Sequence, residues 1–141
     1  MTGAGTPRSV GRFAVGTPAA AVRRFREAIR LDGTPPAAGA DAVPPTFPIT
    51  WLAAPEVRSA LAAALGASLP ESGAALIHLS QRIVLQGPLA IDAAYWLDLT
   101  LAAEESARGF ELEATITDAQ GHRVATLAGR FALVRRPAPA P

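Results

Sequence analysis

Residues 76–101 read LIHLSQRIVLQGPLAIDAAYWLDLTL, and apolar residues alternate along both halves of this stretch. The alternating positions are Ile77, Leu79, Ile83 and Leu85 in the first half, and Tyr95, Leu97, Leu99 and Leu101 in the second. A period of two is typical of a strand with one buried face. The Gly-Pro segment at 87–92 predicts that the chain turns over between strands at 75–86 and 93–103.

Two further strands are predicted near the C-terminus. In residues 109–118 apolar side chains alternate with Glu and Thr, which indicates a half-buried strand. Asp118-Ala119-Gln120-Gly121 has the composition of a hairpin turn, with Gly suited to positive φ. The return strand is expected at 122–134, with Leu127, Phe131 and Leu133 on one face.

The N-terminal half has helical periodicity. A short strand is expected at 12–15, and a helix at 18–31, capped by Thr17 and opened by Pro18. The helix has one apolar stripe, formed by Ala21, Val22, Phe25, Ala28 and Ile29. Because Pro48 and Pro55 cannot lie deep inside one helix, two helices are expected, at 46–54 and 55–65. Helices followed by antiparallel strands predict the α+β class, with helices packed on one face of the sheet.

The central stretch resembles the MaoC-like dehydratases, in particular their non-catalytic N-terminal half. The family segment reads roughly V-H-G-E-Q-R-F, then R-P-L, then G-D. The matching residues here are His78, Gln81, Arg82, Pro88, Leu89 and Asp92, whereas Leu79-Ser80, Gly87 and Ile91 depart from the pattern. The resemblance implies a hotdog fold, a curved antiparallel sheet wrapped around a central helix. The hotdog domain is expected at 11–135. Composition predicts a disordered N-terminus at 1–10, which is small and polar, and a Pro-rich tail at 136–141.

Composition excludes several kinds of chemistry. The chain has 141 residues and a net charge of +1, which gives no excess field to attract nucleic acid. It has no cysteine and only two histidines, far apart, so neither a disulfide nor a zinc site is expected. No apolar run is long enough to cross a bilayer. We therefore expect a cytoplasmic protein that binds no membrane, no metal and no cofactor.

Catalytic members of the resembled family carry the motif D-x-N-P-x-H, whose Asp and His perform acid–base chemistry on enoyl thioesters. The segment here at 32–37 is Asp32-Gly33-Thr34-Pro35-Pro36-Ala37. Ala37 takes the place of the His and has no proton to exchange, so we predict no catalytic residue in this chain. A plain helix end followed by a turn is the alternative interpretation of the segment.

Four residues are candidates for substrate binding: His78, Gln81, Trp51 and Asp32. His78 could bind a thioester carbonyl or a pantetheine amide, or it could be a strand residue satisfied by a neighbour. Gln81 interrupts an apolar row and needs a partner, either the backbone or a ligand in a tunnel. Trp51 is expected in the core on the central helix. The exposed Trp96 could mark a dimer seam or a ligand wall, and we interpret it as part of an edge-to-edge dimer seam.

The resemblance implies a subunit of a 3-hydroxyacyl-thioester dehydratase, or enoyl-CoA hydratase, acting on thioesters of coenzyme A or acyl carrier protein. A homodimer, or a heterodimer with a catalytic hotdog subunit, is expected. Two alternatives stay open: a non-enzymatic acyl-thioester binding protein, and a homo-oligomeric thioesterase that uses Asp32, Asp41 or Glu56.

Overall fold

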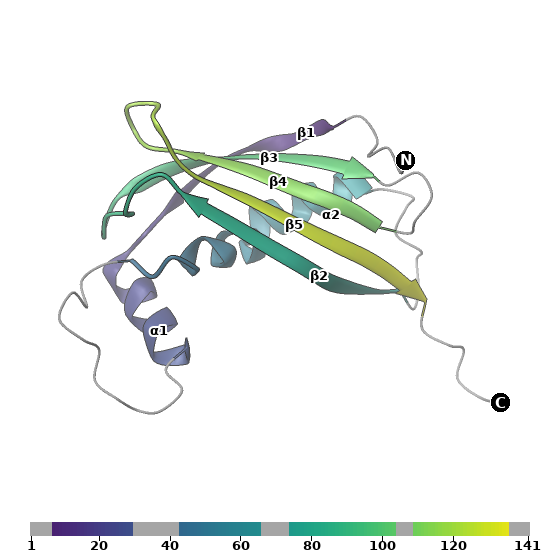
Figure 1. The fold of residues 1–141 in the computed structure, drawn as a ribbon, viewed down its shortest axis with the longest axis horizontal. Coiled ribbons are helices and arrows are strands. Elements are labelled where there is room, and N and C mark those ends of the chain that lie inside the picture. The colour runs from purple at the N-terminus through teal and green to yellow at the C-terminus, as the bar shows by residue number, and fades with distance from the viewer. Residues whose placement is uncertain (1–6, 30–42, 66–73, 104–108, 136–141) are drawn as a thin grey trace.

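The computed structural model describes residues 7–29, 43–65, 74–103 and 109–135. In order along the chain they form β1 (Arg8–Gly16), α1 (Ala19–Ile29), the 3₁₀-helix η1 (Phe47–Ala53), α2 (Pro55–Leu65), β2 (Ala74–Leu85), β3 (Ala94–Ala103), β4 (Gly109–Thr117) and β5 (Arg123–Arg135). The five strands make one antiparallel sheet in the order β1-β3-β4-β5-β2. Figure 1 shows α2 against one face of this sheet, which confirms the predicted α+β arrangement.

The core lies between the sheet and α2. Its sheet side is formed by alternate residues of the three central strands: Leu97, Leu99, Leu101, Phe110, Leu112, Ala114, Ile116, Ala125 and Leu127. Val57 and Leu65 face it from α2, with Leu61 partly buried between them. These helix residues are four apart, so they share one face. The alternation read from the sequence thus correctly identifies the buried faces of β3 and β4.

The segment before α2 is a 3₁₀-helix, where the sequence predicts a helix at 46–54. Phe47, Pro48 and Trp51 are its buried residues. The Trp51 ring lies 6.1 Å from that of Tyr95, and its Nε1 donates to the Gly16 carbonyl at 2.9 Å. Trp51 therefore ties the end of β1 to the core.

The N-terminal cap of α1 differs from the prediction. The Asp92 carboxylate, not Thr17, accepts the hydrogen bond from the Ala19 N–H, at 2.8 Å. Thr17 is 1% exposed, and its hydroxyl donates to the Ala90 carbonyl at 2.5 Å and accepts from the Ala93 N–H at 3.0 Å. The cap thus comes from the turn between β2 and β3, more than 70 residues later in the chain.

The apolar stripe predicted for α1 is only partly buried. Val22 is 1% exposed and Phe25 packs edge-on against Phe47, but Ile29 is 47% exposed. The helix begins at Ala19 and the described part of it ends at Ile29. Only the N-terminal part of the stripe contributes to the core.

The largest departure from the sequence prediction lies in β2. The pairing of β2 with β5 slips between His78 and Ser80, because a β-bulge at Leu79 inserts an extra residue. Ile77 and Leu79 are 43% and 57% exposed, whereas Ile83 packs against the core. The prediction that Ile77, Leu79, Ile83 and Leu85 share one buried face is therefore wrong. The bulge shifts the pairing with β5 by one residue, so side chains before it and after it that were expected on one face lie on opposite faces.

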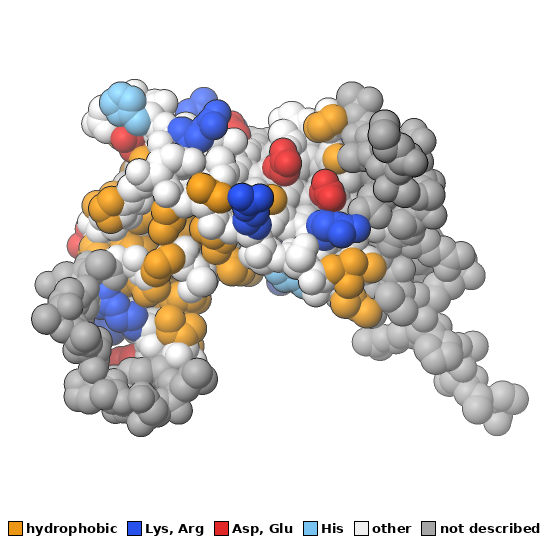
Figure 2. Space-filling model, viewed as in Figure 1, with side chains coloured by type: hydrophobic (Ala, Val, Ile, Leu, Met, Phe, Trp, Pro, Cys, Tyr) orange, Lys and Arg blue, Asp and Glu red, His pale blue; other side chains and the backbone are white. Residues whose placement is uncertain are grey.

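The outer face of the sheet carries paired charges, and Figure 2 shows Arg and acidic side chains on it. Arg12 lies 3.8 Å from Asp98, and its guanidinium sits 4.7 Å from the ring centre of Trp96. Trp96 is 40% exposed, but its strand β3 is flanked by β1 and β4. An edge-to-edge seam through Trp96 is therefore wrong, since β3 is not an edge of the sheet.

The N-terminal strand is longer than expected. β1 begins at Arg8, so residues 8–10, predicted to be disordered, belong to this strand. Arg8 and Ser9 pair with β3, and the register shifts between Ser9 and Gly11. The predicted tail at 136–141 lies outside the described residues. No helix in the described part of the chain is long and apolar enough to cross a membrane.

Candidate functional site

An open apolar pocket of about 520 Å³ lies between the helices and one end of the sheet. Its walls come from η1, α2 and three strands: Ile49, Leu52, Ala53, Arg58, Leu61, Ala62, Leu65, His78, Gln81, Phe110, Leu112 and Phe131. Most of these side chains are apolar. The polar exceptions are Arg58 on α2 and the pair His78 and Gln81 on β2. A pocket of this size, with few polar groups, is typical of a site for a small organic ligand.

An aromatic row forms part of the pocket wall on the sheet side. His78, Phe131 and Phe110 are cross-strand neighbours on β2, β5 and β4. The His78 ring stacks on Phe131 with centres 4.6 Å apart, and Phe131 stacks on Phe110 at 5.2 Å. The three rings thus form a continuous stack along one side of the pocket.

A second row places Gln81 beside Gly129 on β5 and Leu112 on β4. A Cβ at Gly129 would lie 3.0 Å from Gln81 Oε1 and 3.1 Å from the Phe131 ring. The glycine therefore leaves the space in which the Gln81 amide lies. Gln81 Oε1 is buried and has no hydrogen-bond partner among the described residues.

The bulge at Leu79 brings the two polar residues together. His78 and Gln81 are three residues apart, so a regular strand would place them on opposite faces. The extra residue restores a common face, and both side chains line the pocket. His78 Nε2 lies 2.8 Å from the Ser80 carbonyl, across the bulge. A hydrogen bond to that carbonyl orients the ring.

Of the other residues predicted to form the site, those that the structure describes do not line the pocket. Trp51 is buried in the core next to Tyr95 and does not line the pocket. Asp32, Asp41 and the whole segment at 32–37 lie outside the described residues. Glu56 lies exposed in the first turn of α2 and is not part of the pocket wall.

Sequence reasoning missed two kinds of pocket residue. Phe131 is predicted to share one strand face with Leu127, and both pack in or against the core, but the aromatic row appears only once the register is known. Arg58 is the only basic residue in the 55–65 helix, and this single charge in an Ala- and Leu-rich helix is the sequence feature that could have marked it as a pocket residue. It is exposed and lines the pocket, so its guanidinium lies where the pocket meets solvent.

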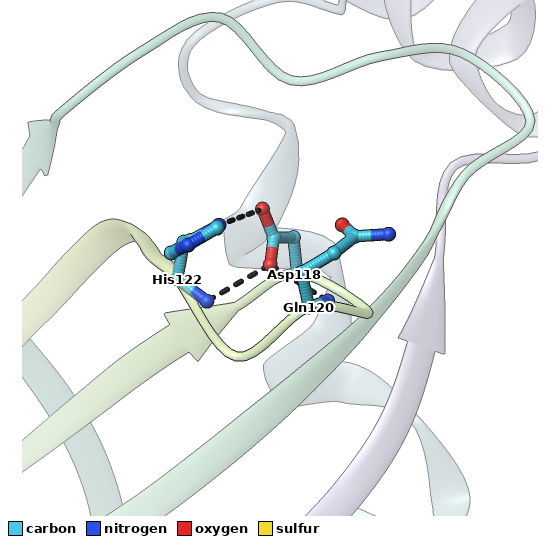
Figure 3. Close-up of polar contacts among 3 residues, drawn as sticks. All are labelled: Asp118, Gln120 and His122. Carbon is cyan, nitrogen blue, oxygen red and sulfur yellow. Dashed lines mark hydrogen bonds and ion pairs between the residues drawn. The ribbon is translucent and has the colours of Figure 1, made fainter.

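The Asp118–His122 hairpin contributes no residue to the pocket wall, and Figure 3 shows its own polar contacts. Asp118 Oδ1 accepts hydrogen bonds from the backbone N–H groups of His122 and Gln120, both at 2.9 Å. The bond from the His122 N–H is the main reason that the pKa of Asp118 is lowered from 3.8. His122 Nδ1 lies 3.5 Å from the same carboxylate. Gly121, with φ of +86°, completes the turn as predicted.

The described residues contain no group of three or more His, Cys, Asp or Glu side chains that could hold a metal ion. Among the described residues that line the pocket, the titratable side chains are those of His78 and Arg58. Neither a metal centre nor an Asp–His pair is assembled by the residues that line it.

Comparison with solved structures identifies the architecture. A hot-dog-like protein from Thermanaerovibrio acidaminovorans matches with a TM-score of 0.63 at 16% identity, over 94% of this chain and 83% of its own. The chain has the hotdog fold. The HadBC (3R-hydroxyacyl-ACP dehydratase) complex of Mycobacterium tuberculosis matches at 0.61 and 17% identity, over 91% and 96% of the two chains. A 1,4-dihydroxy-2-naphthoyl-CoA thioesterase from Synechocystis matches at 0.56 and 17%, over 92% and 88%.

These likenesses establish the hotdog fold at low identity. No protein-family model matches the chain, and no curated protein does. The fold predicted from residues 76–101 is thereby confirmed.

Proposed function

We propose that this chain binds the acyl part of a thioester in the pocket between α2 and the sheet. We propose further that it acts as the non-catalytic subunit of a 3-hydroxyacyl-thioester dehydratase or enoyl-CoA hydratase. The observation that carries the proposal is the pocket itself, with an apolar wall interrupted on β2 by His78 and Gln81. Both residues belong to the motif through which the sequence resembles the N-terminal half of MaoC-like dehydratases.

The chemistry of the pocket suits such a ligand. An acyl chain gains free energy by leaving water for the apolar wall, about 25 cal/mol per Å² buried. Arg58, at the exposed side, suits the phosphates of coenzyme A or of an acyl-carrier phosphopantetheine, because a guanidinium binds phosphate with paired hydrogen bonds. Among similar structures, one is named for a hydroxyacyl-ACP dehydratase and another for an acyl-CoA thioesterase.

The proposal assigns the proton transfers to a partner subunit. The pocket's described wall contains no carboxylate, and Ala37 stands where the resembled motif has its His. Without a general acid–base pair the hydration of an enoyl thioester should be slower by about 10²–10⁴. Hydration would therefore require a hotdog subunit that supplies the Asp and the His.

We place the partner, a catalytic subunit or a second copy, at the edge strand β2. This strand has 12 residues and exposes Ile77, Leu79 and Val84, and among the described strands it pairs with β5 alone. A long apolar edge strand is an aggregation hazard unless it is covered. Because β2 also provides His78 and Gln81, a partner seated there would lie beside the pocket.

A thioesterase is the second candidate, and the similarity to thioesterase structures favours it. Hydrolysis would need a carboxylate or an activated water near the thioester. Of the three carboxylates considered from the sequence, Glu56 is the one that the structure describes, and it does not line the pocket. Asp32 and Asp41 are the remaining candidates from the sequence.

Enzyme assays separate these functions. The purified chain should hydrate crotonyl-CoA or octenoyl-CoA poorly, and adding the hotdog protein encoded by a neighbouring gene should restore the activity. Release of free thiol from acyl-CoA by the chain alone, abolished by Asp32→Ala, Asp41→Ala or Glu56→Ala, would establish the thioesterase instead. Binding of acyl-CoA with neither activity, even beside the partner, would leave a binding protein.

A further inference from the structure

We infer that the outer face of the sheet has a second ligand site, which binds the diphosphate group of a small molecule. The starting observation is a hollow of about 360 Å³ over strands β2, β4 and β5. It shares no lining residue with the pocket beside α2. The inference therefore goes beyond the proposed acyl-thioester binding and does not depend on it.

The hollow lies on the face of the sheet that Figure 2 shows, opposite the core. Ala114 and Leu127 are buried, so their neighbours Thr115 on β4 and Thr126 on β5 point outward. Thr115 and Thr126 are cross-strand partners, and the next outward residue of β5 is Ala128. These three short side chains form the floor of the hollow, because they leave space above the sheet.

Two guanidinium groups that line the hollow have no counterion. Arg82 on β2 and Arg123 on β5 make no ion pair with a described residue. By contrast, Arg130 on the same face lies 3.5 Å from the Glu111 carboxylate, and neither of these two residues lines the hollow. The hollow is thus a place where this face leaves positive charge without a partner.

The positions of the two arginines suit a ligand with two linked anionic groups. Arg82 is the cross-strand partner of Ala128, whereas Arg123 lies five residues before Ala128 on β5. At about 3.4 Å per residue, roughly 17 Å separates the two positions along the strands, so the side chains reach the hollow from opposite ends. A guanidinium binds phosphate with paired hydrogen bonds, so each arginine can hold one phosphate of a diphosphate. The hydroxyls of Thr115 and Thr126, on the floor between them, can donate to its oxygens.

The carboxylate of Glu113 also lines the hollow and opposes an anion there. Ala128 lies between Glu113 and Arg82 in one cross-strand row, and the two charges form no ion pair with each other. Two guanidiniums against one carboxylate leave an excess of positive charge, which attracts an anion. Removal of the Glu113 charge should therefore strengthen binding, which is the opposite effect to removal of either arginine.

Calorimetric titration at physiological ionic strength tests the inference, with inorganic pyrophosphate and inorganic phosphate as probes. Pyrophosphate should bind roughly 10-fold more tightly than phosphate, because both arginines can hold it at once. Arg82→Gln and Arg123→Gln should each weaken pyrophosphate binding by about 10-fold or more, since each removes charge-assisted hydrogen bonds. Glu113→Gln should strengthen it. The amide NMR shifts that pyrophosphate causes should be largest at Thr115 and Thr126.

Arg130→Gln and Glu111→Gln are the matched controls, because they make the same charge changes on the same face but outside the hollow. Both should leave the pyrophosphate affinity nearly unchanged, since a Debye length of about 8 Å screens exposed charges that do not contact the ligand. Arg58→Gln, in the pocket beside α2, should likewise have no effect.

Coenzyme A also contains a diphosphate, so a titration with coenzyme A separates two sources of the ligand. Weaker coenzyme A binding by Arg82→Gln would identify coenzyme A as the ligand of the outer site. Unchanged coenzyme A binding would assign the site to another diphosphate ester. Both results support the site.

Three outcomes overturn the inference. Pyrophosphate that binds no more tightly than phosphate removes the diphosphate site. Equal weakening by Arg82→Gln and Arg130→Gln would show adventitious attraction by overall charge only. Loss of binding in Arg58→Gln would place the anion in the pocket beside α2. None of these outcomes affects the proposed function, whose assays follow acyl thioesters.

Discussion

Strands β4 and β2 both have alternating apolar residues, yet only β4 follows its pattern throughout. β4 lies between β3 and β5, and its Phe110, Leu112, Ala114 and Ile116 are all buried. β2 is an edge strand with a bulge, and its apolar residues exchange faces at Leu79. A strand paired on both sides has its register fixed by two ladders, whereas an edge strand can accept an extra residue at lower cost. The irregular strand is the one that supplies the polar residues of the pocket.

The largest expected effect compares an interior residue with an edge residue. Ile116 on β4 is fully buried, so Ile116→Ala should lower the free energy of unfolding by about 2–5 kcal/mol. Ile77 on β2 is 43% exposed, and Ile77→Ala should cost no more than about 0.5 kcal/mol in the separated protomer. Urea denaturation at dilute protein concentration measures both. Equal losses would show that the two strands are buried alike.

Self-association should depend on β2 and not on the exposed tryptophan of β3. Leu79→Lys places a charge on the exposed edge strand and should shift the mass measured by light scattering from oligomer to monomer. Trp96→Lys is the matched control on the outer face, and it should leave the mass unchanged. If Trp96→Lys dissociated the oligomer and Leu79→Lys did not, the subunit interface would lie on the outer face of the sheet and not at β2.

The turn between β2 and β3 should stabilise helix α1, because its Asp92 caps the N-terminus of that helix. Asp92→Ala removes the acceptor for the Ala19 N–H and should lower the free energy of unfolding by about 0.5–2 kcal/mol. Asp92→Asn is the control, because Asn caps helices equally well and tolerates the positive φ of 55° found here. Thermal unfolding followed by circular dichroism measures the two variants. If both lose the same stability, the carboxylate does not act as a cap.

The connection after β4 should show a smaller, pH-dependent effect. Because the pKa of Asp118 is lowered below 3.8, its carboxylate adds stability above that pH. That stability is lost as the pH falls through the lowered pKa of the folded state. Asp118→Ala should therefore melt below the unaltered chain at pH 6, and the two should converge at the lowest pH. An NMR titration of Asp118 gives the pKa directly, and a value at or above 3.8 would contradict the assignment.

The two connections also show how far sequence reasoning reaches. The Asp118–Gly121 turn was predicted because its hydrogen bonds join residues within five positions of one another. The cap of α1 was assigned to the adjacent Thr17, because its true acceptor, Asp92, lies 73 residues beyond Ala19. Hydrogen bonds between residues close in the sequence can be predicted from it, whereas a partner that the tertiary structure brings in from a distant segment cannot.

The pocket shows the same division. His78 and Gln81 were selected from the sequence, since a motif and an interrupted apolar row marked them. That His78 and Gln81 lie on the same face of β2 could not be predicted, because no sequence feature at Leu79 indicates a β-bulge. The aromatic row of His78, Phe131 and Phe110 depends on the register of three strands, which alternation alone does not determine.

The hydrogen bonds that join Thr17 to the β2–β3 turn have a consequence for the order of folding. Thr17 N–H donates to the Ala93 carbonyl at 3.1 Å, and its own carbonyl accepts from the Asp92 N–H at 2.7 Å. The capping carboxylate reaches α1 only after this long loop has closed. Since an 11-residue helix is marginal in isolation, α1 should consolidate after the rate-limiting step. Substitutions at Val22 would then accelerate unfolding and leave the refolding rate nearly unchanged.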